Sequence, residues 1–260
     1  VARQCGGCQI QEMRYEAQLA FKQKMVQNNL ERIGGLSDFE MYPVIGMETP
    51  YAYRNKAQFP VGEDKDGNIV IGFYAGRTHH IVEQTDCCIG APENGEVLRK
   101  VKAYMQKNQI RPYNEEHHSG IVRHILIRTG YHTKEIMVCL IVNAAKASCL
   151  KNAEQLTESL REMDGMTSVM VNFNTEKTNV ILGKKSEVLW GQPYIEDFIG
   201  NVKYQISPQS FFQVNPMQTE KLYAKALEYA GLTGNETVWD LYCGIGTISL
   251  FLAKNARKVY

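Results

Sequence analysis

Apolar and polar residues recur along the chain with periods that predict both helices and strands. Apolar side chains return every three or four positions, the spacing of one helix face, in four segments: 15–33, 92–108, 147–163 and 215–230. Gly34-Gly35 follows the first segment and Gly231 follows the last, and glycine often ends a helix because it accepts a left-handed backbone. We therefore expect four helices with shorter elements between them.

Short runs rich in apolar and β-branched residues predict strands. The runs are 57–61, 69–74, 80–83, 121–128, 135–143, 167–173 and 178–182. Asp66-Gly67-Asn68 is a turn sequence between the first two runs, and Gly130 lies where a hairpin between two later runs would turn. The order strand–strand–helix occurs twice, which indicates an α+β domain with a largely antiparallel sheet.

The pattern changes near residue 208. A strand at 237–241, a glycine-containing loop, an apolar helix at 247–254 and the start of a strand at 258–260 form a β–α–β unit, which opens a doubly wound parallel sheet. The predicted class is α/β, with an α+β central domain at 1–207 and the incomplete start of a Rossmann-like domain at 208–260. Because so few elements cannot cover both faces of such a sheet, we expect the chain to be truncated there.

Composition indicates a globular protein without identifying its partner. The chain has 260 residues, 44% hydrophobic and 22% charged, and its net charge of +1 is far below that of a dedicated RNA-binding domain. Any RNA site must be a local patch or lie partly outside the chain. No apolar run approaches the roughly 18 residues of a membrane span, and the N-terminus has no signal-peptide pattern. We expect a cytoplasmic monomer without membrane contact.

Two groups of cysteines are candidate metal ligands. Cys5-Gly6-Gly7-Cys8 places two thiols three positions apart on a flexible loop, so that both can converge on one soft metal centre, and Cys87-Cys88 offers another ligand. Zinc, iron–sulfur and thiol redox sites share this spacing, and chance cysteines on a loop are the plain alternative. A zinc site would draw its fourth ligand from His79 or His80.

The turn after the strand at 237–241 is a candidate cofactor site. Asp240 ends the strand, and Gly244-Ile245-Gly246 leads into a helix, where glycines let a ligand approach the backbone closely. The third glycine of a dinucleotide fingerprint is missing, which disfavours a nicotinamide or flavin oxidoreductase. An acidic group at the strand end suits S-adenosylmethionine because it can interact with the methionine ammonium. A tight turn without a ligand is the alternative.

Aromatic and basic residues are candidate nucleic-acid contacts. Phe211-Phe212-Gln213 could stack on a base or adenine and hydrogen-bond it, although a buried core with Asn215 as a helix cap is the commoner explanation of such a motif. Basic residues that could contact phosphate, or could equally be exposed charges on a sheet face, are Arg54, Lys56, Arg123, His124 and Arg128.

Taken together, the motifs resemble the RNA uracil-5-methyltransferase family, in particular its iron–sulfur branch, which modifies 23S ribosomal RNA. The resemblance covers nearly the whole chain, and its motifs occur in the family's order: Cys5-Gly6-Gly7-Cys8-Gln9, Tyr53-Arg54-Asn55-Lys56, Cys87-Cys88-Ile89, Gly120-Ile121-Val122-Arg123-His124, Phe211-Phe212-Gln213-Val214-Asn215 and Asp240-Leu241-Tyr242-Cys243-Gly244-Ile245-Gly246.

This resemblance implies a [4Fe–4S] cluster and S-adenosylmethionine as cofactors. Cys5, Cys8 and Cys87 match three of four cluster ligands, and the remaining ligand would precede Val1, so we expect truncation at this end too. The residues that match cofactor-contacting positions are Gln213, Tyr242 and Thr247, with Asp240, Gly244 and Gly246 in the turn. Thr247 departs from the Asn common in some members. Phe211 and the five basic residues named above are the expected RNA contacts.

The family's reaction is methylation of uracil C5 in RNA. A cysteine thiolate adds to C6, C5 attacks the methyl group of the sulfonium, and a base then removes the C5 proton. We expect both the thiolate and the base to lie beyond Tyr260, with Cys139 in the core and Cys243 beneath the cofactor, so that this chain alone is inactive. Ribosomal RNA is favoured. The alternatives are a transfer RNA substrate and a non-catalytic iron–sulfur or zinc RNA-binding module.

Overall fold

The structure is a computed structural model that describes residues 3–260. Its helices are α1 (Tyr15–Asn28), α2 (Asn94–Lys107), α3 (Ala153–Arg161), α4 (Pro216–Ala230) and α5 (Thr247–Leu252), with a π-helical turn at Asn29–Ile33 and 3-10 turns at Ala147–Cys149 and Ala253–Asn255. The helices expected from the sequence are confirmed. The segment 147–163 becomes α-helical only at Ala153, because Asn152 has a left-handed backbone (φ 51°).

A seven-stranded sheet forms the centre of the fold, in the order β3-β2-β1-β4-β5-β6-β7. Its strands are β1 (Lys56–Glu63), β2 (Ile69–Tyr74), β3 (Ile81–Glu83), β4 (Val122–Thr129), β5 (Ile136–Val142), β6 (Met166–Phe173) and β7 (Lys185–Gly191). Neighbours pair antiparallel except β5 and β6, which are parallel because α3 crosses over between them. The largely antiparallel sheet is therefore confirmed, as a mixed sheet within an α/β fold.

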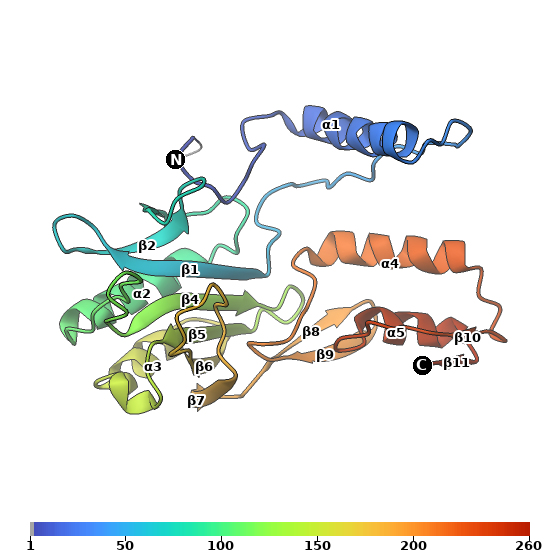
Figure 1. Ribbon diagram of the computed structural model, residues 1–260. Coiled ribbons are helices and arrows are strands. Elements are labelled where there is room, and N and C mark those ends of the chain that lie inside the picture. Colours follow the sequence, from blue (N-terminus) through green and yellow to red (C-terminus); the bar gives the residue numbers. More distant parts are fainter. Residues whose placement is uncertain (1–2) are drawn as a thin grey trace.

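Both faces of this sheet are covered, which explains the continuous apolar run of β5. Val138 and Leu140 pack with α2 and α3 on one face. Met137 and Cys139 belong to a second buried cluster, with Phe212 and residues of the hairpin formed by β8 (Ile195–Ile199) and β9 (Val202–Ile206). This hairpin lies on the side of the sheet away from α2 and α3 (Figure 1). The fully buried Cys139 is a core residue, as expected from the sequence.

Three strands were not predicted, and one predicted strand is wrong. The strands not predicted are β7, β8 and β9. β7 is mostly exposed and carries no apolar period, and in β8 the charged Asp197 occupies the buried position between Ile195 and Ile199. Residues 178–182 form a loop instead of a strand. The side chain of Asn174 donates to the carbonyls of Val180 and Ile181, so these carbonyls are satisfied without a strand partner.

The C-terminal part begins a second, parallel sheet. β10 (Thr237–Val238) precedes α5 in the sequence and β11 (Lys258–Val259) follows it. The two strands pair in parallel, as the β–α–β pattern predicts. α5 packs against the central part through Ile248 and Phe251. The Tyr204 hydroxyl donates to the Thr247 carbonyl at 3.0 Å and fixes the start of the helix. The domain boundary at 207/208 stays a prediction.

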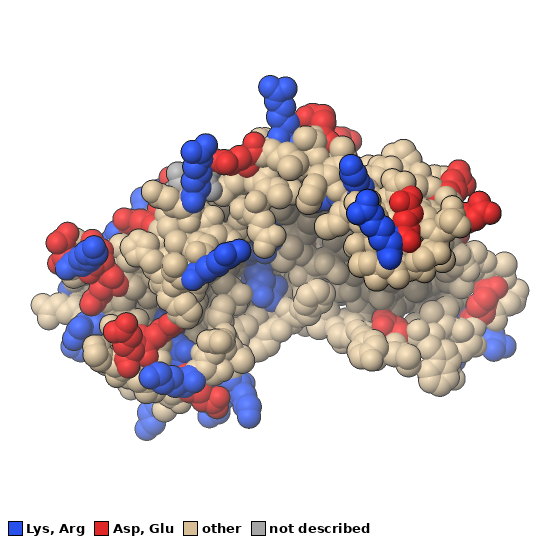
Figure 2. Space-filling model, turned by 45° about the horizontal axis from the view of Figure 1, so that its top comes forward, with Lys and Arg blue, Asp and Glu red and all other residues tan. Residues whose placement is uncertain are grey.

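The surface carries mixed charge, in keeping with the small net charge of the sequence. Figure 2 shows Lys and Arg interspersed with Asp and Glu around a hollow that crosses this face of the molecule. Among residues 3–260, no helix is both long enough and apolar enough to cross a membrane.

Candidate functional site

Cysteines far apart in the sequence line one cavity of about 560 Å³. Cys5 and Cys8 come from the N-terminal loop, and Cys87 and Cys88 precede α2. The loop lies against β2 because the amide of Gly6 donates to the Tyr74 carbonyl at 2.9 Å. A Cβ atom at Gly6 would come within 2.8 Å of that carbonyl oxygen, so this close approach requires glycine.

The cavity holds thiols and cations together. The pKa of Cys8 is raised, first by burial and then by the neighbouring Cys87, Cys5 and Cys88, while Arg54 opposes this shift. Lys56 lines the same cavity, and its burial, with Arg128 and Arg54 nearby, lowers its pKa to about 8. Three of these thiols are the predicted iron ligands, and thiolates are the ligands that iron–sulfur clusters prefer, so the donor chemistry fits. Within the described residues, no three His, Cys, Asp or Glu side chains form a site for a single metal ion.

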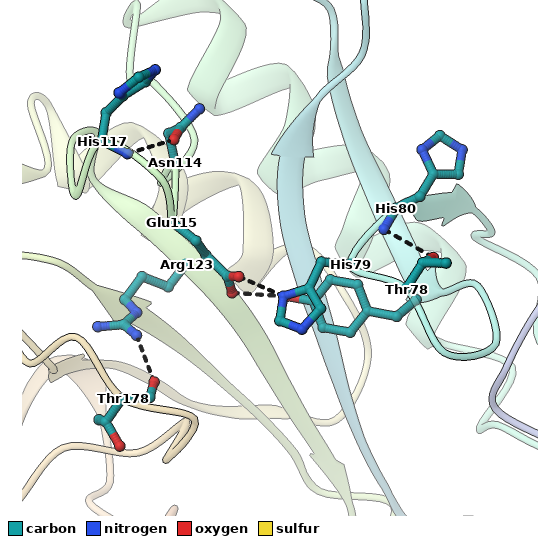
Figure 3. Close-up of polar contacts among 9 residues, drawn as sticks. Thr78, His79, His80, Asn114, Glu115, His117, Arg123 and Thr178 are labelled. Atoms are coloured by element: carbon teal, nitrogen blue, oxygen red, sulfur yellow. Dashed lines mark hydrogen bonds and ion pairs between the residues drawn. The ribbon is translucent and has the colours of Figure 1, made fainter.

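The histidines proposed as zinc ligands do not line the cysteine cavity. His79 turns towards Glu115, with 2.6 Å between its Nδ1 atom and Oε2 of the carboxylate, while the Tyr74 hydroxyl lies 3.4 Å from the other oxygen (Figure 3). The backbone amide of His80 donates to the Thr78 hydroxyl. Both histidines line a separate groove with Asp64 and Glu115. The structure therefore does not support the zinc alternative.

A short segment before β1 connects the cysteine cavity to the Phe211–Asn215 motif. The amides of Ala52 and Arg54 donate to the carbonyls of Cys88 (2.8 Å) and Ile89 (2.9 Å). The next amide, that of Asn55, donates to the Val214 carbonyl at 3.0 Å. Three motifs that are separate in the sequence thus become hydrogen-bonded neighbours.

Buried polar side chains hold the backbone between residues 208 and 214 on the sheet. The Asn55 side chain donates to the Gln213 carbonyl at 3.0 Å. The Arg128 guanidinium donates to the carbonyls of Pro208 (3.2 Å) and Ser210. With these carbonyls held and Phe212 anchored in the core, Phe211 stays 70% exposed. The role of Asn55 could not be predicted from the sequence, since nothing in the pattern separates a bridging amide from its basic neighbours.

Burial corrects the interpretation of three basic residues. Arg123, His124 and Arg128 lie on β4 and are each more than nine-tenths buried, so they are not exposed charges on a sheet face. The Arg123 guanidinium donates to the carbonyls of Asn174 (2.8 Å) and Glu176 (2.7 Å). It also donates to the Thr178 carbonyl at 3.3 Å (Figure 3). Arg54 and Lys56 are partly accessible, within the cysteine cavity. Contact of these residues with RNA stays a prediction.

The predicted cofactor turn has the backbone that its glycines suggest. Gly244 and Gly246 have φ values of 56° and 78°, which other residues rarely adopt. The Asp240 carboxylate accepts from the Ser249 hydroxyl at 2.5 Å and from the Tyr242 amide at 3.3 Å. The Tyr242 side chain is 95% exposed and therefore free to meet a ligand.

Thr247 is placed differently from the other predicted cofactor residues. Its side chain is buried, and its hydroxyl lies 2.8 Å from the Tyr223 hydroxyl. Ile245 and Ile248, on either side of it, pack against the same apolar cluster as Phe212. The turn and the Phe211–Gln213 segment therefore border one common core, and Thr247 contributes to the support of this core.

The chain is similar to known RNA methyltransferases along its whole length. The family model for tRNA (Uracil-5-)-methyltransferase matches residues 14–260. Two relatives, each named an uncharacterised RNA methyltransferase, are similar along 100% of this chain and 56% of their own length: that of Bacillus cereus is 49% identical and that of Halalkalibacterium halodurans 50%. This chain thus spans about half the length of the curated relatives that it matches.

A solved structure shares the fold. The Pyrococcus abyssi tRNA (uracil-54, C5)-methyltransferase, in complex with S-adenosyl-L-homocysteine, superposes with a TM-score of 0.76 at 29% sequence identity. The match covers 96% of this chain and 56% of that one.

The first prediction concerns the bridging amide. Asn55→Ala removes the donor to the Gln213 carbonyl and should lower the free energy of unfolding by about 1–3 kcal/mol. Amide hydrogen exchange of residues 209–214 should become about tenfold faster, because the segment can then open locally. Asn143→Ala is the matched control, since that amide donates to the Gly120 carbonyl, remote from this segment. Equal exchange of residues 209–214 in the two variants would disprove the role of Asn55.

The second prediction concerns the pH dependence of stability. Burial, and then the neighbouring Arg123, lower the pKa of His124 to about 4, below its ordinary value near 6.5. The unfolded chain therefore binds more protons between about pH 6.5 and 4, and stability falls as the pH drops through this window. The variant His124→Gln should lose less stability over this window than the unmodified protein. Chemical denaturation at pH 7 and 4.5 measures this, with the exposed His117→Gln as control.

Proposed function

We propose that this chain, which belongs to the tRNA (uracil-5-)-methyltransferase family, acts in the transfer of a methyl group from S-adenosylmethionine to C5 of a uridine in RNA. The observation that carries the proposal is the shared core beneath the cofactor turn and the Phe211–Gln213 segment. An exposed aromatic ring, an amide and a glycine turn with an acidic strand end are thereby held in one region. The bound S-adenosyl-L-homocysteine named for the Pyrococcus abyssi relative supports this methyl donor.

The chain's own residues have the task of binding and orientation. Asp240 offers a carboxylate to the methionine ammonium, and Gly244 and Gly246 let the cofactor approach the backbone. Gln213 offers an amide to the cofactor, and Phe211 a ring on which an unstacked base can lie. S-adenosylmethionine supplies a sulfonium methyl group, and addition of a thiolate at C6 makes uracil C5 nucleophilic enough to accept it.

We do not assign the nucleophile to any cysteine among residues 3–260. Burial raises the pKa of Cys139 to about 12, and its side chain has no access to solvent. Cys243 is exposed, but it lies inside the cofactor turn, where its Sγ atom is 3.7 Å from the Gly244 carbonyl oxygen. Cys5, Cys8 and Cys87 are better explained as ligands, because they line one cavity.

We further propose that the cysteine cavity holds a [4Fe–4S] cluster and that the RNA is 23S ribosomal RNA. The proposal of a cluster rests on the position of Cys5, Cys8 and Cys87 in one cavity. The cations Arg54 and Lys56 line the same cavity and would balance the negative charge of a cluster. Its role is to fix the N-terminal loop, since methyl transfer from a sulfonium needs no electron transfer. The ribosomal substrate rests only on the iron–sulfur motifs, and a transfer RNA uridine is the second candidate, favoured by the family's name.

The third prediction tests the methyl transfer. In a protein of the relatives' full length, Gln213→Ala should lower kcat/KM for S-adenosylmethionine at least tenfold, measured as transfer of labelled methyl groups to ribosomal and to transfer RNA. Gln209→Ala is the control, because that side chain is exposed in the same segment and donates to the Ser186 hydroxyl. Equal activity of both variants would contradict the role of Gln213. No transfer to either RNA by the unmodified protein would contradict the proposed function.

The fourth prediction tests the cysteine cavity. Iron and sulfide analysis of anaerobically purified protein should find iron that is lost in Cys87→Ser, together with the broad absorbance near roughly 400 nm expected of a cysteine-ligated cluster. Cys149→Ser is the control, since Cys149 is half-buried beside the core and does not line the cavity. Stoichiometric zinc, or full iron content in Cys87→Ser, would exclude the proposed ligand set.

A further inference from the structure

A groove of about 550 Å³ lies between α1 and the central part of the molecule. It begins beside the cysteine cavity, with which it shares Cys8 and Arg54, and it extends to Asn215 at the start of α4. The hollow in Figure 2 crosses this face, with a Lys or Arg side chain in its depth. The groove thus ends two residues from Gln213.

The frame of this groove is fixed by hydrogen bonds. The amide of Met47 donates to the Tyr15 hydroxyl at 2.6 Å, and that of Val44 donates to the Gln23 side chain at 3.2 Å, so α1 is tied to the segment 44–47. The Gln218 side chain donates to the Ile45 carbonyl at 2.8 Å and ties this segment to α4. α1 contributes no buried residue to the core, and its place is set by these contacts.

The charge in the groove has one sign. Its lining contains three cations, Arg14, Lys22 and Arg54, and no Asp or Glu. Within the described residues, none of the three forms an ion pair with a carboxylate. Three unneutralised cations in a concave surface attract a polyanion, although the whole chain has a net charge of only +1.

Aromatic rings and amides accompany these cations. Tyr51, which is 61% exposed, and Tyr53 lie on one wall, while Tyr15 projects from α1. Tyrosine rings stack on unpaired bases, and side-chain amides such as that of Gln9 can bond base edges. The Oε1 atom of Gln218 is buried at this site without a hydrogen-bond partner among the described residues, so an acceptor is available.

We infer that this groove binds a single-stranded stretch of the RNA substrate and leads it to the Phe211–Gln213 segment. The inference rests on the proposed function and names the surface by which the RNA is held. Cations without acidic partners favour a polyanion over a neutral or basic peptide. Tyrosines and amides in a groove of this size suit unstacked bases, whereas duplex RNA is recognised across its wide minor groove. The RNA contacts therefore lie below α1, away from the buried cations of β4.

The fifth prediction compares Lys22→Glu with Lys24→Glu in the 260-residue chain. Both lysines are on α1, but only Lys22 lines the groove. Fluorescence anisotropy with a labelled single-stranded uridine-containing 12-nucleotide RNA should show Kd increased about tenfold or more in Lys22→Glu, and by less than about twofold in Lys24→Glu. Tyr51→Ala should also weaken binding at least fivefold, by loss of one stacked base. Circular dichroism of each variant verifies the fold.

Several outcomes would overturn this inference. Equal weakening in Lys22→Glu and Lys24→Glu would mean attraction to the helix as a whole, and unchanged affinity in both Lys22→Glu and Tyr51→Ala would place the RNA elsewhere. Absence of RNA binding by the unmodified chain would leave the groove to another partner, such as a peptide. The methyl-transfer assay separates these cases from failure of the proposed function: RNA that binds in the groove without being methylated contradicts only the latter.

Discussion

The backbone hydrogen bonds of the segment Ala52–Asn55 are the constraint on which the rest of the site depends. The amides of Ala52 and Arg54 donate to the carbonyls of Cys88 and Ile89, and the Asn55 amide donates to the Val214 carbonyl. The Asn55 carbonyl accepts from the Thr129 amide in β4. Ala52 has a left-handed φ of 49°, a conformation that costs a non-glycine residue roughly 1 kcal/mol. Such a conformation persists only where the surrounding structure holds it, and here the hydrogen bonds to the segments around Cys88 and Val214 do so. A shift of this segment would therefore displace the cysteine cavity and the Phe211–Gln213 segment together.

The buried cations of β4 serve the same arrangement. Burial of an unpaired guanidinium would be costly, and Arg123 and Arg128 offset part of this cost by donating to backbone carbonyls of loops that lack strand partners. Each arginine replaces several missing ladder bonds, which lets a loop lie on the sheet without becoming part of it. The loop at 174–178 and the segment at 208–210 are held in this way. These charges thus order the backbone around the site.

The sequence predicted the periodic elements well and the polar architecture poorly. α2, α4 and the hairpin of β4 and β5 follow from apolar periodicity, and the two glycines of the cofactor turn from their backbone requirement. The strand expected at 178–182 does not form, because two hydrogen bonds from the Asn174 side chain compete with strand pairing. Such tertiary contacts leave no local sequence pattern. For the same reason Arg128 looked like an exposed charge. The cysteines were recognised as one group, but the segment that brings them to Gln213 was not.

Net charge is a poor guide to a site of this kind, because only local charge acts over a Debye length of about 8–10 Å. Acidic residues are frequent on this protein and offset its cations in the sum, yet none lines the groove below α1. The same groove adjoins the cysteine cavity, where Arg54 lies between both. A cluster with negative charge in the cavity would draw on this guanidinium, and so would a phosphate in the groove. Occupation of one site would then weaken the attraction of Arg54 for the other.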